Sequence, residues 1–148
     1  MRPTPPGFDP QVWTELEEAR AQLKSGETAG ALATYRRAFD GCAARSDHYH
    51  ATVIAHMAGV AEPDPTKKHE WNLAALREAD AVTDRDRVKD TYASNYNNLG
   101  MSYAQLGERE KAIETFQRAL AHVGDVPAGP YADQVRAAIE RNLARALA

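Results

Sequence analysis

Residues 96–119 carry the feature that most constrains the fold, because small and aromatic side chains recur there at fixed offsets. Gly100 is followed three residues later by Tyr103, and Ala112 is followed four residues later by Phe116. Residues three and four apart share one face of a helix. Each half therefore predicts an amphipathic helix with one small and one large residue on its apolar side. Such a helix pair cannot bury both apolar faces alone, so we expect further copies to stack on it.

The second half of this stretch has an earlier copy in the chain, since residues 26–39 align without gaps to residues 107–120. The alignment pairs Gly26 with Gly107, Ala31 with Ala112, Tyr35 with Phe116 and Ala38 with Ala119. A glycine after a helix can adopt the left-handed conformation that a Cβ resists, so both glycines predict a helix end and a turn. The first helix of the earlier copy departs from the pattern, with Glu18-Ala19 for Leu99-Gly100 and Gln22 for Tyr103.

The whole pattern resembles the tetratricopeptide repeat, which has Trp, Leu-Gly and Tyr in its first helix and Ala and Phe in its second. The matching residues here are Tyr96, Leu99-Gly100, Tyr103, Ala112 and Phe116, while Pro127 comes slightly late for the final proline. The resemblance implies an all-α, right-handed α-solenoid of three tetratricopeptide-like hairpins with a C-terminal capping helix. The Ala- and Arg-rich composition suggests a bacterial source.

Caps and breaks divide the chain into seven expected helices. Asp9 is expected to cap the first helix with Pro10 at its first position, and Thr66 to cap the fourth after the Pro63–Pro65 break. One long helix is expected over about 84–106. The aligned glycines are farther apart than two repeats of about 34 residues, so the middle repeat is assigned by position and size. The predicted segments are a disordered or extended arm at 1–8 and a single domain at 9–148, with repeats at about 9–45, 46–83 and 84–123 and a capping helix at 130–148.

Composition excludes several classes of function. The net charge of -3 argues against a dedicated nucleic-acid binder, and no apolar run approaches the length of a membrane span. The start of the sequence lacks the apolar segment of a secretory signal. Cys42 is the only cysteine, and we expect it to pack as a small apolar residue in a reducing cytoplasm.

The resemblance also implies a binding surface, because the first helices of tetratricopeptide hairpins line a concave groove that commonly holds a peptide. The candidate groove residues are Arg20, Lys24, Thr52, His56, Trp71, Asn97, Asn98, Met101 and Gln105. Asn97 is the strongest single candidate, since an amide offers both donors and an acceptor to a peptide backbone or a terminal carboxylate. Thr52 and His56 stand where a basic pair would be needed, so the family's full carboxylate clamp is absent. The alternative is that Asn97 and Asn98 only solvate a helix face.

No catalytic or metal-binding pattern emerges. The sequence has no Gly-rich phosphate loop and no nucleophile elbow. His48, His50 and His56 fall in one short segment, but they lack the i, i+4 spacing of a helical metal site, and hydrogen bonding in a polar core is favoured. A packing role for Cys42 is favoured over a Cys/His dyad. We therefore expect no catalytic residues, no metal and no cofactor.

The leading interpretation is a non-enzymatic cytoplasmic module that binds an unidentified protein or peptide in a concave groove, with a possible homodimer through an end helix. The alternative is a small-molecule-binding or enzymatic pathway protein with a pocket around His56, Trp71 and Asn97. A weaker third option is a sensor domain separated from a DNA-binding partner chain. One continuous bound chain would favour the first interpretation, and a closed pocket with converging ionisable groups would favour the second.

Overall fold

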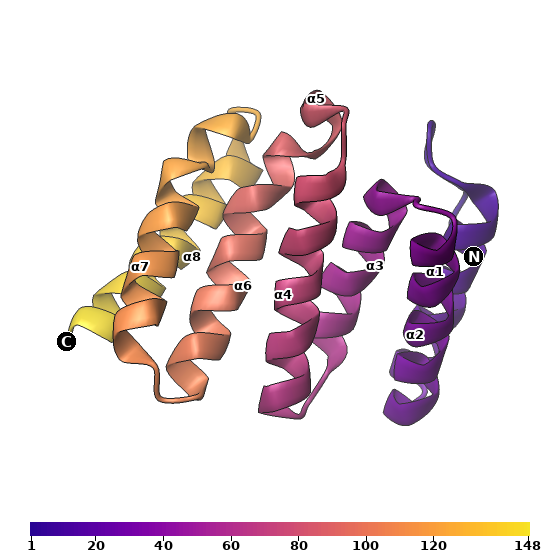
Figure 1. Cartoon of the computed structure of the whole chain (residues 1–148), viewed down its shortest axis with the longest axis horizontal. Helices are drawn as coiled ribbons and strands as arrows, with labels where there is room; N and C mark the ends of the chain where they lie inside the picture. The colour runs from indigo at the N-terminus through magenta and orange to yellow at the C-terminus, as the bar shows by residue number, and fades with distance from the viewer. The chain divides into compact units, whose positions relative to one another are not determined.

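The computed structural model describes all residues 1–148 and is all-helical, without a strand (Figure 1). Its helices are α1 (Pro10–Lys24), α2 (Thr28–Ala44), α3 (His48–Ala61), α4 (Pro65–Ala81), the single turn α5 (Arg85–Val88), η1 (Lys89–Thr91), α6 (Tyr92–Gln105), α7 (Arg109–Ala121), η2 (Val123–Asp125) and α8 (Pro130–Leu147). The predicted class of tetratricopeptide-like helix hairpins is confirmed. The chain forms two compact units, Met1–Glu78 and Ala79–Ala148. The expectation that 9–148 is one domain stays a prediction.

The first unit, Met1–Glu78, begins with the hairpin α1–α2, which has the predicted start and turn. The Asp9 side chain accepts hydrogen bonds from the backbone N–H groups of Gln11 and Val12, and Pro10 occupies the first helical position. Gly26 has a φ of 80°, in the left-handed region. The Glu27 N–H then donates to the Gln22 carbonyl at 2.8 Å. This bond caps the end of α1 before α2 begins.

The second hairpin, α3–α4, forms by a close approach at Gly59. A Cβ added to Gly59 would lie 2.7 Å from Asn72 Oδ1 and 3.3 Å from Trp71 Cβ. Lys68 Nζ donates to the Gly59 carbonyl at 2.7 Å, which caps the end of α3. The middle region thus has its own small-residue contact, although it lacks the repeat pattern. α2 packs against both α1 and α3, so the two hairpins share one core.

The predicted cap of α4 is wrong. Asp64, and not Thr66, supplies the capping oxygen, because Asp64 Oδ2 accepts from the Lys67 N–H at 3.1 Å. α4 consequently begins at Pro65. A proline is well suited to the first helical position, since its missing N–H would have no partner there. The aspartate one residue earlier is therefore in place to cap.

The segment before α1 forms no helix but contacts the first unit. The Arg2 guanidinium donates to Glu17 Oε1 at 2.8 Å, and the Trp13 indole N–H donates to the Arg2 carbonyl at 2.8 Å. The Phe8 ring meets the His50 ring edge-on at a centroid distance of 4.5 Å. These contacts hold residues 1–8 as an extended arm against α1 and α3.

The second unit contains the hairpin α6–α7 with α8 packed against both helices (Figure 1). Gly107 has a φ of 82° and ends α6 as expected. Gly100 brings the two helices together, since an added Cβ would lie 2.6 Å from two carbons of the Phe116 ring. Ile139 on α8 completes the core of this unit and is fully buried.

The expectation of one long helix over 84–106 is wrong, because this segment is divided into α5, η1 and α6. Val88 leaves the helical region with φ −121° and ψ −17°, and the Thr91 hydroxyl donates back to the Val88 carbonyl at 2.7 Å. Such side-chain bonds compete with the helical ladder. Arg85 also donates to the carbonyls of Ala79 and Val82, both at 2.9 Å. The Thr91 bond lies where the expected helix is interrupted, and the Arg85 bonds satisfy carbonyls at the end of α4.

Candidate functional site

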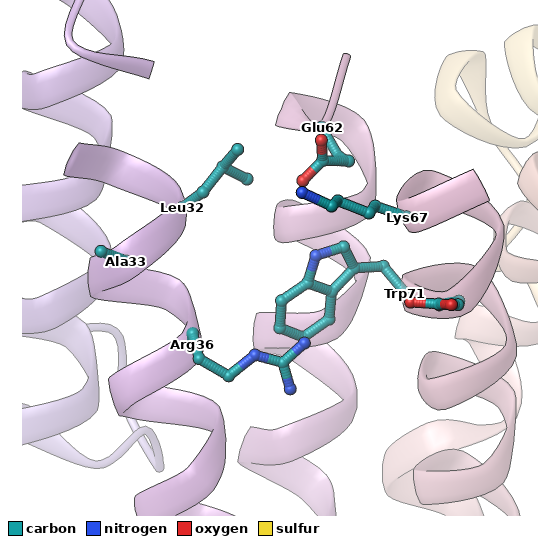
Figure 2. Close-up of a pocket in the computed structure, with 7 residues that line it drawn as sticks. Leu32, Ala33, Arg36, Glu62, Lys67 and Trp71 are labelled. Atoms are coloured by element: carbon teal, nitrogen blue, oxygen red, sulfur yellow. The ribbon is translucent and has the colours of Figure 1, made fainter. Parts of the chain in front are cut away.

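The second helices of the two hairpins in unit one, α2 and α4, line a cavity of about 340 Å³. Its lining residues are Leu32, Ala33 and Arg36 from α2, Glu62 from the α3–α4 turn, and Lys67, Glu70 and Trp71 from α4. Figure 2 shows the Trp71 indole in the middle, with Arg36 on one side and Glu62 and Lys67 on the other. The cavity therefore combines an apolar wall with four ionisable groups.

Aromatic contacts hold Arg36 in place at this cavity. Its guanidinium lies over the Trp71 ring, 4.0 Å from the centroid, and 5.7 Å from the centroid of Phe39. The Phe39 ring in turn meets the Trp71 ring edge-on at 5.4 Å. A guanidinium over an indole face is attracted by the ring's negative face. The contact orients the Arg36 N–H groups, because a planar guanidinium on a ring keeps them at its edge.

Glu62 places a fixed carboxylate at the opposite side of the indole. Glu62 is only 6% exposed, and its Oε1 accepts the Asp64 N–H at 3.1 Å. Lys68 is engaged elsewhere, since its ammonium caps the carbonyls of Gly59 and Val60. Lys67 is the lysine that lines the cavity, and Figure 2 shows its ammonium pointing toward the Glu62 carboxylate.

The predicted groove residues of unit one fall in different surroundings. Arg20 lies 3.8 Å from the Glu17 carboxylate, and Lys24 is exposed in the last turn of α1. Thr52 is 2% exposed and its hydroxyl donates to the Ala75 carbonyl at 2.7 Å, so it joins α3 to α4 and we leave it out of the proposed site. His56 is half-buried on α3 and does not line the cavity.

Trp71 is the one predicted residue that lines the cavity, and its neighbours there were missed. Arg36, Lys67 and Glu70 are exposed charged residues on helices, a pattern that usually indicates a solvated face. Their convergence depends on how α2 and α4 pack. A sequence signal existed only for the aromatic wall.

The predicted groove residues of the second unit share a helix. Asn97, Met101 and Gln105 recur every four residues on α6 and lie along one face. Asn97 Oδ1 accepts from Asn142 Nδ2 of α8 at 3.0 Å. Met101 is 49% exposed and Gln105 is also exposed, whereas Asn98 is half-buried on another face. The contribution of α8 was missed, because nothing in its sequence marks Asn142 as a partner of Asn97.

Two of the histidines have structural roles, as expected. His50 Nε2 accepts the Asp9 N–H at 3.0 Å, while His50 Nδ1 lies 2.9 Å from both oxygens of Asp47. This arrangement requires the proton on Nδ1 and a neutral ring. His48 Nδ1 lies 2.7 Å from Glu78 Oε2. Both rings therefore tie α3 to neighbouring segments.

Cys42 packs in the core of the first unit, where it is buried. Burial raises the pKa of the Cys42 thiol to about 11. Because the thiolate is the reactive form, a thiol that stays protonated at neutral pH is a poor nucleophile. The packing role that the sequence favoured is thus supported.

Comparison with known protein families identifies the second unit's hairpin. Residues 93–122, which cover most of α6 and all of α7, match the family model described as tetratricopeptide repeat. The chain contains a tetratricopeptide repeat. Repeats of this family serve generally as protein-interaction modules and as non-enzymatic scaffolds. No curated protein matches the chain. None of the helices combines the length and apolar character needed to cross a bilayer.

Proposed function

We propose that this protein is an interaction module that binds a peptide segment of a partner protein, and that α6 contacts the peptide through Asn97, Met101 and Gln105. The observation that carries the proposal is the stripe of half-buried Asn97 and exposed Met101 and Gln105 on the first helix of the tetratricopeptide repeat. A large apolar side chain, Met101, is about half exposed in the middle of that stripe. In this family the first helix of a hairpin is the one that commonly faces a bound peptide.

The side chains of this face suit a peptide better than a charged ligand. Met101 is unbranched and polarisable, so it adapts to different partner side chains. The bond from Asn142 fixes the Asn97 amide, and a fixed amide discriminates between the donors and acceptors of a peptide backbone. Tyr131 on α8 adds an exposed aromatic ring whose hydroxyl lies 3.4 Å from Ser94 Oγ. None of these residues is charged, which favours apolar and amide contacts.

A peptide selection on the full chain tests this proposal. A phage-displayed library of random peptides is selected on the wild-type protein, and the enriched peptide is synthesised for calorimetric titration. Met101→Lys and Asn97→Ala should each weaken its binding by about tenfold, the loss expected when an interface residue contributes more than about 1 kcal/mol. The matched control is Gln117→Lys, an exposed substitution on α7.

Two outcomes would contradict the proposal. Enriched peptides that bind wild type, Met101→Lys and Gln117→Lys equally would place the site on another face. A selection that enriches no peptide would argue against peptide recognition by this chain. Purification of the chain from its host, with mass spectrometry of the bound proteins, would then supply the natural partner for the same titrations.

A further inference from the structure

We propose that the cavity between α2 and α4 binds a small zwitterion of the amino-acid class, a molecule with an ammonium group, a carboxylate and an apolar body. The cavity lies wholly in the first unit. The inference is independent of peptide binding at α6, because it depends on different residues of a different unit.

The balance of charges in the lining favours a ligand without net charge. Two cationic side chains, Arg36 and Lys67, face the same cavity as two carboxylates, Glu62 and Glu70. A nucleotide or phosphate ester needs an excess of cationic groups, and a polyamine needs an excess of carboxylates, because electrostatic complementarity selects the partner. Equal numbers of both signs suit a ligand that carries one charge of each.

Arg36 is suited to the carboxylate of such a ligand. The rings of Trp71 and Phe39 hold its guanidinium, and a guanidinium binds a carboxylate through two parallel N–H donors. Its present ion pair with Asp40 spans 3.7 Å between two exposed side chains. Exposed pairs of this kind contribute little. Arg36 can therefore exchange Asp40 for a ligand carboxylate at small cost.

Glu62 is suited to the ammonium group. Its carboxylate is buried and oriented by the Asp64 N–H, and a buried carboxylate gains from a charged donor. Figure 2 places Glu62 across the indole from Arg36, with Leu32 beside the gap. The two polar ends are thus separated by an apolar wall, which matches a molecule whose charged groups flank an apolar body. The indole nitrogen of Trp71 is drawn on the side of Leu32 and Glu62, where its N–H adds a donor.

The size of the cavity suits a small molecule. Its volume of about 340 Å³ lies at the lower end of small-molecule sites, which span about 300–1,000 Å³. A free amino acid or a dipeptide fits this volume, and a dinucleotide cofactor does not. The terminus of a longer peptide would bring only one of the two charged groups, the ammonium or the carboxylate, into the cavity.

Fluorescence of Trp71 provides a direct test. The chain has two tryptophans, so Trp13→Phe leaves Trp71 as the single indole reporter. Titration of this protein with L-leucine and with L-leucyl-L-leucine should give a saturable change in emission for at least one of them, which also separates the amino acid from the dipeptide. N-acetyl-L-leucine lacks the ammonium and L-leucinamide lacks the carboxylate. Each should bind about tenfold more weakly, because each lacks one of the two charged contacts that the zwitterion makes.

Three variants in the same background assign the effect to the cavity. Arg36→Gln and Glu62→Gln should each weaken binding of the zwitterion by about tenfold. Arg37→Gln, which changes the next residue of α2 and lies outside the lining, should bind as the parent does. Glu62→Gln keeps an acceptor for the Asp64 N–H, and thermal melts by circular dichroism confirm that all three variants fold. The proposal is overturned if neither zwitterion gives a saturable signal, if the blocked analogues bind equally well, or if Arg36→Gln and Arg37→Gln behave alike.

Discussion

The hairpins α1–α2 and α6–α7 share a turn but differ in how their helices meet. In both, the N–H of the third residue after the helix bonds back to a carbonyl at about the same distance: Glu27 to Gln22 at 2.8 Å and Glu108 to Tyr103 at 2.9 Å. The next helix starts in the same way, with Ala31 and Ala112 fully buried. One short segment of sequence therefore produces the same turn in two places.

The helix contacts of these hairpins are not the same. Gly100 leaves no room for a Cβ beside Phe116, whereas the aligned Ala19 already carries one and is fully buried. At the position of Tyr103 the first hairpin has Gln22, whose Oε1 accepts the Thr34 hydroxyl at 2.7 Å. A polar pair thus replaces an aromatic contact. The comparison teaches that both hairpins keep the turn and the small residue of the second helix, while the residues of the first helix that contact the second helix differ.

The largest test of this comparison removes the aromatic residue from each hairpin. Phe116→Ala and Tyr35→Ala should each lower the free energy of unfolding by about 3–5 kcal/mol, because both side chains are almost fully buried and leave a cavity. Urea unfolding followed by circular dichroism measures the cost, and hydrogen exchange with mass spectrometry locates it in one unit. A much smaller cost for Tyr35→Ala would show that the two aromatic residues are not equivalent.

A smaller effect is expected at the residue where the two hairpins differ. Gly100→Ala should cost about 1–3 kcal/mol through overpacking, since its Cβ would lie 2.6 Å from the Phe116 ring. The reverse change, Ala19→Gly, should cost about 1 kcal/mol through helix propensity. Gly100→Ala combined with Phe116→Leu should cost less than the sum of the two single variants. Strict additivity of the two changes would remove Phe116 as the cause.

The two turn glycines should respond alike. Gly26→Ala and Gly107→Ala should each cost about 1–2 kcal/mol, because a Cβ is unfavourable at φ of 80° and 82°. An added Cβ would meet nothing within 4 Å at either position, so the cost is conformational. Gly41→Ala on α2 is the control, and it should stabilise the chain by up to about 1 kcal/mol. Unequal losses at Gly26 and Gly107 would contradict the equivalence of the two turns.

The smallest effect concerns the cap of α1, where the two hairpins also differ, since no side chain caps α6. Asp9→Ala should cost about 1 kcal/mol. The Val12 N–H, then the Gln11 N–H and the charge of Arg45, hold the pKa of Asp9 below its ordinary value of 3.8, despite some loss of hydration. Because the pKa of Asp9 is lower in the folded chain than in the unfolded chain, the contribution of its charge to the free energy of unfolding is complete above pH 3.8. That contribution is lost as the pH falls through the pKa of Asp9 in the folded chain.

Asp9→Asn separates the cap from its charge, because asparagine caps helices about as well as aspartate. Urea unfolding of wild type, Asp9→Asn and Asp9→Ala between neutral and acid pH should show the acid loss of this increment in wild type alone. An identical acid dependence in all three proteins would exclude Asp9 as its source.

Much of the helical organisation was predictable because its determinants are local. The cap at Asp9, the turns at Gly26 and Gly107 and the bounds of α8 follow from residues close together in the chain. The predictions failed where competing side-chain bonds act: the Thr91 hydroxyl bonds back to Val88 where the expected long helix is interrupted, and Asp64 displaces Thr66 as the cap of α4. Periodicity reports which side chains are apolar, but not which hydrogen bonds replace the helical ladder.

The candidate sites also have one part that the sequence predicted and another that it did not. The sequence by itself determined the repeat and placed Asn97, Met101 and Gln105 on one face of a helix, because helical spacing places residues on faces, and it predicted Trp71 as a candidate site residue. Only the tertiary structure decided that Asn142 holds Asn97, that Thr52 joins two helices, and that Arg36 and Glu62 meet at Trp71. Those contacts join residues on different helices, and the distance between two helix faces is set by the packing of the whole core.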